Sequence, residues 1–260
     1  MTIPSTSAPG LKAEDWIAGL EKGLAIIEAF DAAHPRLTAT EAGQRCAMTR
    51  TAARRYLKTL AHLGYVGSDG KHFWLMPRVL RLGHAYLAST PLPRLVQPFL
   101  QRITAGTEET VYLGVLDGLD TVFIARSGMP RHTSTGYLPG ARVHAQVTAA
   151  GMAILSSLPI ADMRAWVDAC PLQAFTLFTL SSREQLLQAL GRCRLQGWAL
   201  SEQQLDLNSR GIAVPLLDQS NRVHGAISVT MPMNREETDH ALHRVLPVLQ
   251  DAARNLRALL

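Results

Sequence analysis

The sequence predicts an α+β protein: an N-terminal winged helix-turn-helix, a linker helix, and a C-terminal antiparallel sheet domain flanked by helices. Two short helices joined by a tight turn fit residues 38–62, and a hairpin pattern follows at once over 64–75. Beyond about Val96, pairs of β-branched segments are separated by helical segments. Such a separation of strands and helices is typical of an α+β domain with an antiparallel sheet.

The first two predicted helices have clear start signals. Thr38 followed three residues later by Glu41 forms a capping box, which marks a helix start. Thr49 is a suitable N-cap for a second helix, which we expect over 49–62. Apolar residues fall on one side of this second helix at spacings of four and three: Ala53, Leu57 and Leu60.

The opposite side of the second helix is rich in cations. Between Gln44 and Arg81 the chain has eight Arg or Lys residues against one acid, Asp69. Two short helices with an arginine-rich outer side suit the major groove of DNA, and phosphate attraction requires a one-sided positive field. A solvated basic helix surface is the alternative interpretation. The predicted DNA-binding residues are Arg45, Thr49, Arg50, Thr51, Arg54, Arg55, Lys58 and Lys71.

The hairpin and two further helices complete the N-terminal part. Strands over 64–68 and 71–75 meet at Asp69-Gly70, a strong two-residue turn signal, so they form the wing. Pro77 opens a linker helix whose apolar residues cover more than one side, and we expect it to pack against a partner subunit. Packing on its own domains is the alternative. A first helix is indicated by apolar residues at helical spacing: Ile17, Leu20, Leu24, Ile27 and Phe30.

The C-terminal part contains strand pairs and helices. Ser181 and Glu184 form a second capping box, and Pro247 should kink or split the last helix. Strands are predicted at 110–116, 121–126, 211–217 and 223–231. Helices are predicted at 148–158, 161–169, 181–197 and 236–260.

Composition restricts the class of protein. With 260 residues, the chain has room for a second domain of roughly 160 residues beside a winged helix. A net charge of +5 agrees with a nucleic-acid partner. The chain has no apolar run that could span a membrane, no signal-peptide pattern and three widely separated cysteines, so we expect a cytoplasmic protein. It also lacks HExxH, GxSxG and phosphate-loop motifs, and we expect no catalytic residues, metal or cofactor.

Several segments together resemble the IclR-type transcriptional regulators. They are KGLAIIEAF (22–30), the run from LTATEAG to TRTAARRYLKTLAHLGYV (37–66), RVLRLGHAYL (78–87), PGARVHAQVTAAGMAIL (139–155) and SRGIAVPLLD (209–218). PRVLRLGHAYLASTPL and FIARS (123–127) further resemble the branch that controls aromatic-acid breakdown, the regulators of p-hydroxybenzoate, protocatechuate and β-ketoadipate pathways. The resemblance implies a GAF-like effector-binding domain, a homodimer or dimer of dimers, and a small carboxylated aromatic or ring-cleavage metabolite as effector.

Taken together, these observations predict a ligand-responsive transcription factor that binds double-stranded operator DNA at palindromic or repeated half-sites. An architectural winged-helix protein without an effector, or an enzyme acting on aromatic acids, are the alternatives. The expected organisation is a disordered N-terminal arm (1–14), the winged helix-turn-helix (15–76), the linker helix (77–90) and the GAF-like domain (91–260).

An anionic effector requires positive groups directed at its carboxylate. A helix N-terminus offers backbone N–H groups and a partial positive charge. We therefore expect the effector near Thr148, where small side chains allow close approach to the backbone. Thr148 as a simple helix cap and Arg142 paired with a surface acid are the alternative interpretations. The predicted effector-binding residues are Arg142, Thr148, Ala149, Ala150, Gly151, Arg210, Ser228 and Thr230, the arginines as bidentate partners and the last two as hydroxyl donors on one strand face.

Overall fold

A computed structural model describes residues 11–128 and 137–260 of the chain. These residues divide into two compact units, one ending at Ser89 and the other beginning at Thr90. The predicted N-terminal arm lies largely outside the described residues, apart from a short 3-10 turn at Ala13–Asp15. None of the described helices is long and apolar enough to cross a membrane.

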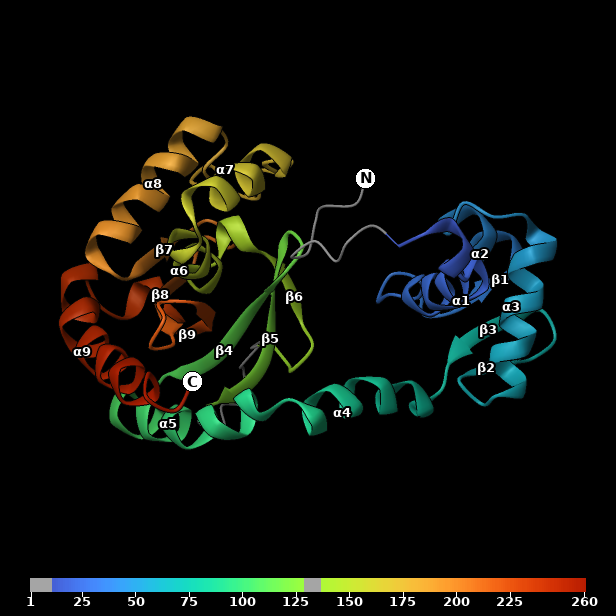
Figure 1. The fold of residues 1–260 in the computed structure, drawn as a ribbon, viewed down its shortest axis with the longest axis horizontal. Coiled ribbons are helices and arrows are strands. Elements are labelled where there is room, and N and C mark those ends of the chain that lie inside the picture. The colour runs from blue at the N-terminus through green and yellow to red at the C-terminus, as the bar shows by residue number, and fades with distance from the viewer. Residues whose placement is uncertain (1–10, 129–136) are drawn as a thin grey trace. The chain divides into compact units, whose positions relative to one another are not determined.

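The first unit is a winged helix-turn-helix, as predicted (Figure 1). Its three-stranded antiparallel sheet has the order β1-β3-β2. The elements are α1 (Ala18–Glu28), β1 (Leu37–Thr38), α2 (Ala39–Arg45), α3 (Arg50–His62), β2 (Val66–Ser68) and β3 (His72–Leu75).

Local hydrogen bonds fix the starts of α2 and α3. The Thr38 backbone N–H donates to the Glu41 carboxylate at 2.7 Å, and the Glu41 N–H donates to the Thr38 hydroxyl at 3.3 Å. This is the predicted capping box. The Thr49 hydroxyl caps α3 by accepting from the N–H of Ala52 at 3.2 Å. Between the helices Ala47 adopts a φ of +51°, so the turn is tight enough to need a left-handed residue.

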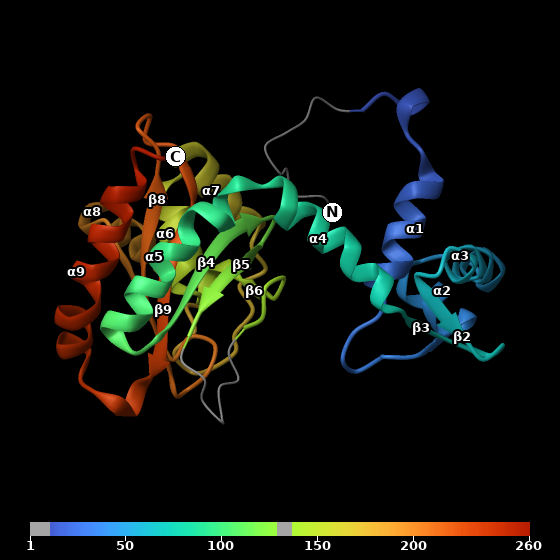
Figure 2. The same cartoon turned by 90° about the horizontal axis from the view of Figure 1, so that it is seen from below.

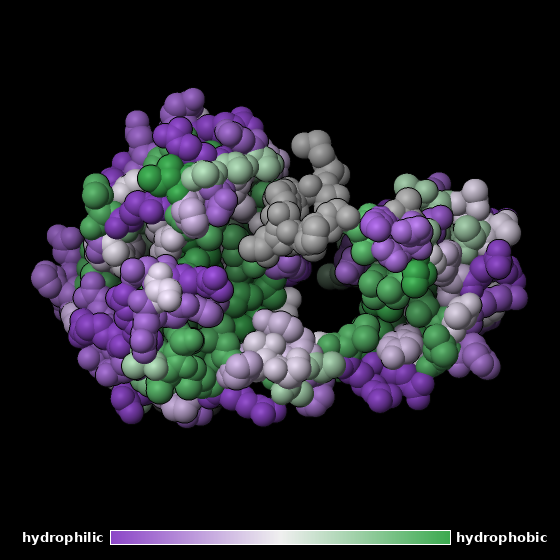
Figure 3. All heavy atoms as spheres, in the orientation of Figure 1, coloured by the Kyte–Doolittle hydropathy of each residue, from purple (hydrophilic) through white to green (hydrophobic). Residues whose placement is uncertain are grey.

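The core of this unit is built from the apolar sides of its helices and wing. The helix over 18–28 forms, but three of the residues that predict it remain at the surface: Ile17, Leu20 and Leu24. Ile26 supplies its buried side instead. Figure 3 shows hydrophobic side chains at the surface around α1. The buried cluster contains Ile26, Leu37, Ala53, Leu57, Leu60 and Phe73, among others.

The predicted linker helix also forms, as a 3-10 turn at Pro77–Val79 followed by α4 (Leu80–Ser89). No residue of α4 is buried. Leu80, Leu82 and Tyr86 are 74%, 46% and 44% exposed, so the described chain leaves much of the apolar surface of α4 uncovered.

The second unit has a six-stranded antiparallel sheet in the order β6-β5-β4-β9-β8-β7 (Figures 1 and 2). Helix α6 packs across the middle of one face, with α8 against it, whereas α5 and α9 contact each other and the opposite face. The strands are β4 (Thr110–Asp117), β5 (Asp120–Ser127), β6 (Arg142–His144), β7 (Ala199–Glu202), β8 (Ser209–Leu217) and β9 (Val223–Pro232). The helices are α5 (Pro91–Thr107), α6 (Ala149–Ser157), α7 (Ile160–Ala169), α8 (Arg183–Gln196) and α9 (Thr238–Leu256).

Three details differ from the sequence predictions. Helix α8 is capped one residue later than expected, because the Ser182 hydroxyl accepts from the N–H of Gln185 at 3.2 Å. Helix α9 runs through Pro247 without a break, so of the predicted kink or split the split was wrong. Helix α5 and the short strands β1, β6 and β7 were not predicted.

Candidate nucleic-acid interface and effector pocket

Helix α3 presents its cations to solvent. Its buried side is Ala53, Leu57 and Leu60, and the helical repeat therefore turns the basic residues outward. Within the described chain none of these cations makes an ion pair, so their charge is available to an anionic partner. The exposed polar residues of α3 include the five predicted ones, Arg50, Thr51, Arg54, Arg55 and Lys58.

Arg45 is held differently from the α3 cations. Its guanidinium donates to the Asp31 carboxylate and lies 2.9 Å from Nδ1 of His34. The hydrogen bond from His34 and the charge of Arg45 lower the pKa of Asp31. Arg45, which is predicted to contact DNA, is thus already paired with a surface acid. Its side chain is still 34% exposed.

Two further cations lie on or beside the wing, Lys71, which was predicted, and Arg36, which was not. Lys71 is exposed at the tip, where its backbone N–H donates to the Asp69 carboxylate at 3.0 Å. Arg36 lies over the Trp74 ring, with its guanidinium carbon 4.5 Å from the ring centroid. Register explains the contact, because β1 begins directly after Arg36 and pairs with β3, which carries Trp74. The available sequence signals were an arginine directly before Leu37 and an aromatic residue, Trp74, in the predicted wing strand.

A small cavity lies between the N-terminus of α6 and the sheet. Its volume is about 30 Å³, which is the space of roughly one water molecule. Five predicted effector residues line it, namely Thr148, Ala149, Ala150, Ser228 and Thr230. The other lining residues are Phe123, Tyr137, Val147, Ser201, Gln204, Leu205, Ser209 and Gly211.

The start of α6 is rigidly placed and has two unused donors. The Thr148 hydroxyl accepts from the N–H of Gly151 at 2.9 Å and lies 2.9 Å from the Thr121 hydroxyl. Thr148 is therefore a helix cap as well as a cavity residue. The backbone N–H groups of Ala149 and Ala150 find no acceptor in the parts of the chain that the structure describes. They are suited to a carboxylate.

Gly151 has a packing role. A Cβ there would stand 2.2 Å from the carbonyl oxygen of Ala145, so the position accepts only glycine. Gly151 does not line the cavity. Its backbone contributes to the site only by donating to Thr148.

The opposite wall of the cavity combines hydroxyls with aromatic rings. The hydroxyls of Ser228 and Thr230 have no hydrogen-bond partner among residues 11–128 and 137–260. Phe123 and Tyr137 stack with ring centroids 4.8 Å apart, and Tyr112 packs 5.0 Å from Phe123. Burial raises the pKa of both tyrosines, so their phenols stay protonated at neutral pH. This aromatic cluster was not predicted from the sequence.

Arg142 does not reach the cavity. It projects from β6 and donates to the carboxylates of Asp117 at 2.6 Å and Asp120 at 3.1 Å. The structure thus shows the alternative interpretation of this residue, an ion pair at the surface. The reason is that β6 pairs with β5 at the sheet edge, directly beside the β4–β5 turn that holds both acids.

Arg210 is also absent from the cavity, and the expectation of a carboxylate grip there was wrong. Its side chain is 2% exposed and donates to Glu202 at 2.6 Å, to the Glu236 carbonyl at 2.8 Å and to the Thr238 hydroxyl at 3.0 Å. Successive residues of a strand point to opposite faces. Because Gly211 faces α6, Arg210 must face α9.

Comparison with known proteins identifies the family. The model of the IclR helix-turn-helix domain matches residues 19–70, and the model of the bacterial transcriptional regulator IclR C-terminal domain matches residues 84–258. The chain belongs to the IclR family of transcriptional regulators. This confirms the predicted resemblance and a ligand-responsive, DNA-binding regulator with a C-terminal effector-binding domain.

Individual relatives agree with this assignment. The Pca operon regulatory protein of Acinetobacter baylyi is 36% identical over 260 residues, covering 98% of this chain and 94% of the relative. The p-hydroxybenzoate hydroxylase transcriptional activator of the same organism is 36% identical over 258 residues, covering 97% and 95%. The inducer-binding domain of an Acinetobacter PobR double mutant, solved with 3-hydroxybenzoic acid, superposes with a TM-score of 0.61 at 29% identity, covering 65% of this chain and 98% of that one.

Proposed function

We propose that this IclR-family regulator controls genes of aromatic-acid catabolism and binds an aromatic carboxylate in the cavity beside α6. The observation that supports the proposal is the set of unpaired groups around that cavity. Two backbone N–H groups, of Ala149 and Ala150, are available to a carboxylate, and two hydroxyls, of Ser228 and Thr230, are available to a ring substituent. The rings of Phe123 and Tyr137 supply an aromatic wall.

The cavity must enlarge when the effector enters. Its volume is about 30 Å³, whereas a cavity that holds benzene has about 150 Å³. The side chains of Tyr137, Gln204 and Leu205 line it away from the rigid start of α6. We infer that these three residues move, and that the effector selects the arrangement in which they are displaced.

DNA binding belongs to α3. We propose that Arg50, Thr51, Arg54 and Arg55 face bases or nearby phosphates, and that Lys58 is a phosphate contact further along the groove. Lys71 in the wing, and Arg36, which lies over the Trp74 ring, would add contacts to the DNA phosphate backbone. Arg45 would have to exchange Asp31 for a phosphate. Because operator DNA lies in the cytoplasm, the protein would act there.

A homodimer is part of the proposal. Exposed apolar side chains on α1 and α4, such as Leu20 and Leu80, lack a covering partner among the described residues. Burying them between two copies would pair two recognition helices for two half-sites. The effector can then act by favouring one arrangement of the paired helices.

The experiment uses an operator selected from random DNA by the purified protein, and its affinity is measured with and without 4-hydroxybenzoate. We expect 4-hydroxybenzoate to change the operator affinity. The double variant Ser228→Ala, Thr230→Val should need about fivefold to 150-fold more effector, because two hydrogen bonds of roughly 0.5–1.5 kcal/mol each are lost. Ser220→Ala, in the exposed β8–β9 turn, is the matched control.

Each outcome has a clear meaning. Operator binding that no hydroxybenzoate or related acid changes would favour an architectural DNA-binding protein. If the double variant and Ser220→Ala need the same effector concentration to change operator affinity, the effector does not bind in the α6 cavity.

A further inference from the structure

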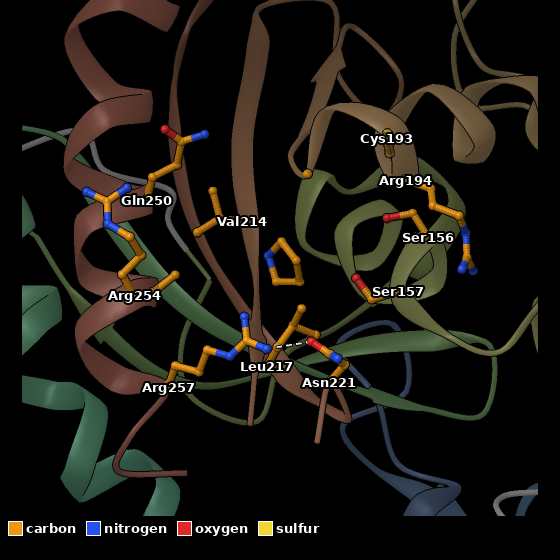
Figure 4. Close-up of a pocket in the computed structure, with 13 residues that line it drawn as sticks. Ser156, Ser157, Cys193, Arg194, Val214, Leu217, Asn221, Gln250, Arg254 and Arg257 are labelled. Atoms are coloured by element: carbon orange, nitrogen blue, oxygen red, sulfur yellow. Dashed lines mark hydrogen bonds between the residues drawn. The ribbon is translucent and has the colours of Figure 1, made fainter. Parts of the chain in front are cut away.

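The larger cavity of the second unit is distinct from the proposed effector site. It has a volume of about 500 Å³, within the range of about 300–1,000 Å³ that small-molecule sites occupy. It shares no lining residue with the cavity at the N-terminus of α6. Figure 4 shows it between α6, α8, α9 and the end of β8.

The cavity exists because β7 is shorter than β8. The pairing of these strands runs from Glu202 opposite Arg210 to Ala199 opposite Ala213 and then stops. The rest of β8, residues 214–217, has no strand on that side. Gly197, with a φ of +77°, ends α8 and turns the chain into β7, which leaves the space beside the strand open.

The floor of this space is apolar and its rim is cationic. Val214, Pro215 and Leu217 form the floor, and Ala253 of α9 adds to it. Arg194 of α8 and Arg257 at the end of α9 belong to the lining, and no carboxylate does. In Figure 4 the serine hydroxyls at the end of α6 face the strand across the cavity from α9.

The two rim arginines have only neutral partners in the described chain. Arg257 donates to the Asn221 side-chain oxygen at 2.5 Å, drawn as the dashed line in Figure 4. Arg194 donates to the carbonyl of Leu158. Arg254, the third arginine of the lining, is 3.3 Å from Asp251, and both side chains are well exposed. The cavity therefore has an excess of positive charge beside an apolar surface.

We propose that this cavity is a second small-molecule site, which takes an organic carboxylate with an apolar body. The carboxylate would pair with Arg257 and Arg194, whose guanidinium groups can form charge-assisted hydrogen bonds in place of their neutral ones. The apolar body would lie on Val214 and Pro215. Strand addition to β8 by a peptide is disfavoured, because Pro215 has no N–H to donate.

The test uses full-length protein and 4-bromobenzoate as the probe. Calorimetry measures its affinity, and the anomalous signal of bromine in crystals locates it. We expect a bromine peak against Val214 and Pro215, and a binding event that Arg257→Gln weakens about tenfold or more. Arg164→Gln, which removes another exposed charge, from α7, is the matched control and should bind normally.

A second variant tests whether binding requires the space of the cavity and not only the charge of its arginines. Ala253→Leu keeps every arginine but fills the floor from α9, and it should weaken the same event. The double variant Ser228→Ala, Thr230→Val should leave this event unchanged, so failure of the α6 effector site would not imitate failure here.

Four results would overturn the proposal. The first is equal affinity in Arg257→Gln and Arg164→Gln. The second is a bromine peak only at the start of α6. The third is a peak in crystals without a matching event in solution, which would mean binding at crystal concentration only. The fourth is acetate binding as tightly as 4-bromobenzoate, which would mean a simple anion site.

Discussion

Gly43 lies in a tight contact between α2 and the turn that leads to α3. A Cβ at this position would stand 2.8 Å from the carbonyl oxygen of Met48 and 3.4 Å from the N–H nitrogen of Arg50. Both neighbours are backbone atoms, so they cannot move aside without shifting the start of the recognition helix. A Cβ added at Gly23 in α1 would have no neighbouring atom within 4 Å.

These two glycines give a paired prediction for stability. Gly43→Ala should lower the free energy of unfolding of the winged unit by about 1–3 kcal/mol, because the added methyl group overpacks the turn. Gly23→Ala should raise it by up to about 1 kcal/mol, because alanine favours a helix. Urea unfolding followed by circular dichroism measures both. Equal effects in the two variants would contradict the tight contact at Gly43.

Arg54 is the residue for which we predict a direct effect on sequence recognition. It is exposed on α3 and makes no ion pair in the described chain. If it contacts a base edge, Arg54→Ala should cost about 1–3 kcal/mol of discrimination between operator and non-operator DNA. Competition binding at fixed salt measures this, with the exposed Arg222→Ala as the control. Weakening that is equal on all sequences would assign Arg54 to phosphate alone.

At the scale of elements, Arg210 joins the edge of the sheet to the start of α9. It bonds Glu202 on β7 and both the Glu236 carbonyl and the Thr238 hydroxyl at the helix start. Arg210→Ala leaves the Glu202 carboxylate and the Glu236 carbonyl without this partner. We expect a loss of roughly 3 kcal/mol in the free energy of unfolding, measured by urea titration. Arg222→Ala, exposed in the β8–β9 turn, should change it by less than about 0.5 kcal/mol. A stable Arg210→Ala protein that no longer binds 4-hydroxybenzoate would restore this arginine to the effector site.

The elements also show which parts of the fold were predictable. Helix α3 combines an N-cap, a regular apolar side and a basic side, so local signals agree with tertiary packing. Helix α5 was missed because Pro91, Pro93 and Pro98 suggest a break, although the first two fall in the first turn, where proline is tolerated. The two-residue strand β1 and the three-residue strand β6 depend on their partners rather than on their own sequences.

The candidate site was predictable only where local rules apply. The N-terminus of α6 follows from Thr148 and the small residues after it, and the shared face of Ser228 and Thr230 follows from strand alternation. The same alternation predicts that Arg210, the neighbour of Gly211 on β8, points to the sheet face opposite α6 and away from the cavity. The positions of Arg142 and Tyr137 depend on how separate segments meet in space, which a single sequence does not reveal.

At the scale of the whole molecule, we predict that exposed apolar side chains of the winged unit support the dimer. The double variant Leu20→Glu, Leu24→Glu places two charges on α1 and should shift sedimentation toward a monomer. Operator affinity should fall with it, because one half-site alone is then bound. Leu177→Glu, at a 97% exposed position in the other unit, is the control. Unchanged sedimentation of the α1 variant would place the dimer contact elsewhere.

The near absence of empty space beside α6 has a consequence for sensitivity. When only a minor fraction of molecules has a binding-competent site, the apparent dissociation constant rises by the inverse of that fraction. An open fraction of about 1% would make the response roughly a hundredfold less sensitive than the contacts alone allow. Such a regulator would not respond to trace concentrations of the effector and would switch only at high concentrations. Substitutions that loosen Tyr137 or Leu205 would lower the effector concentration needed for the response.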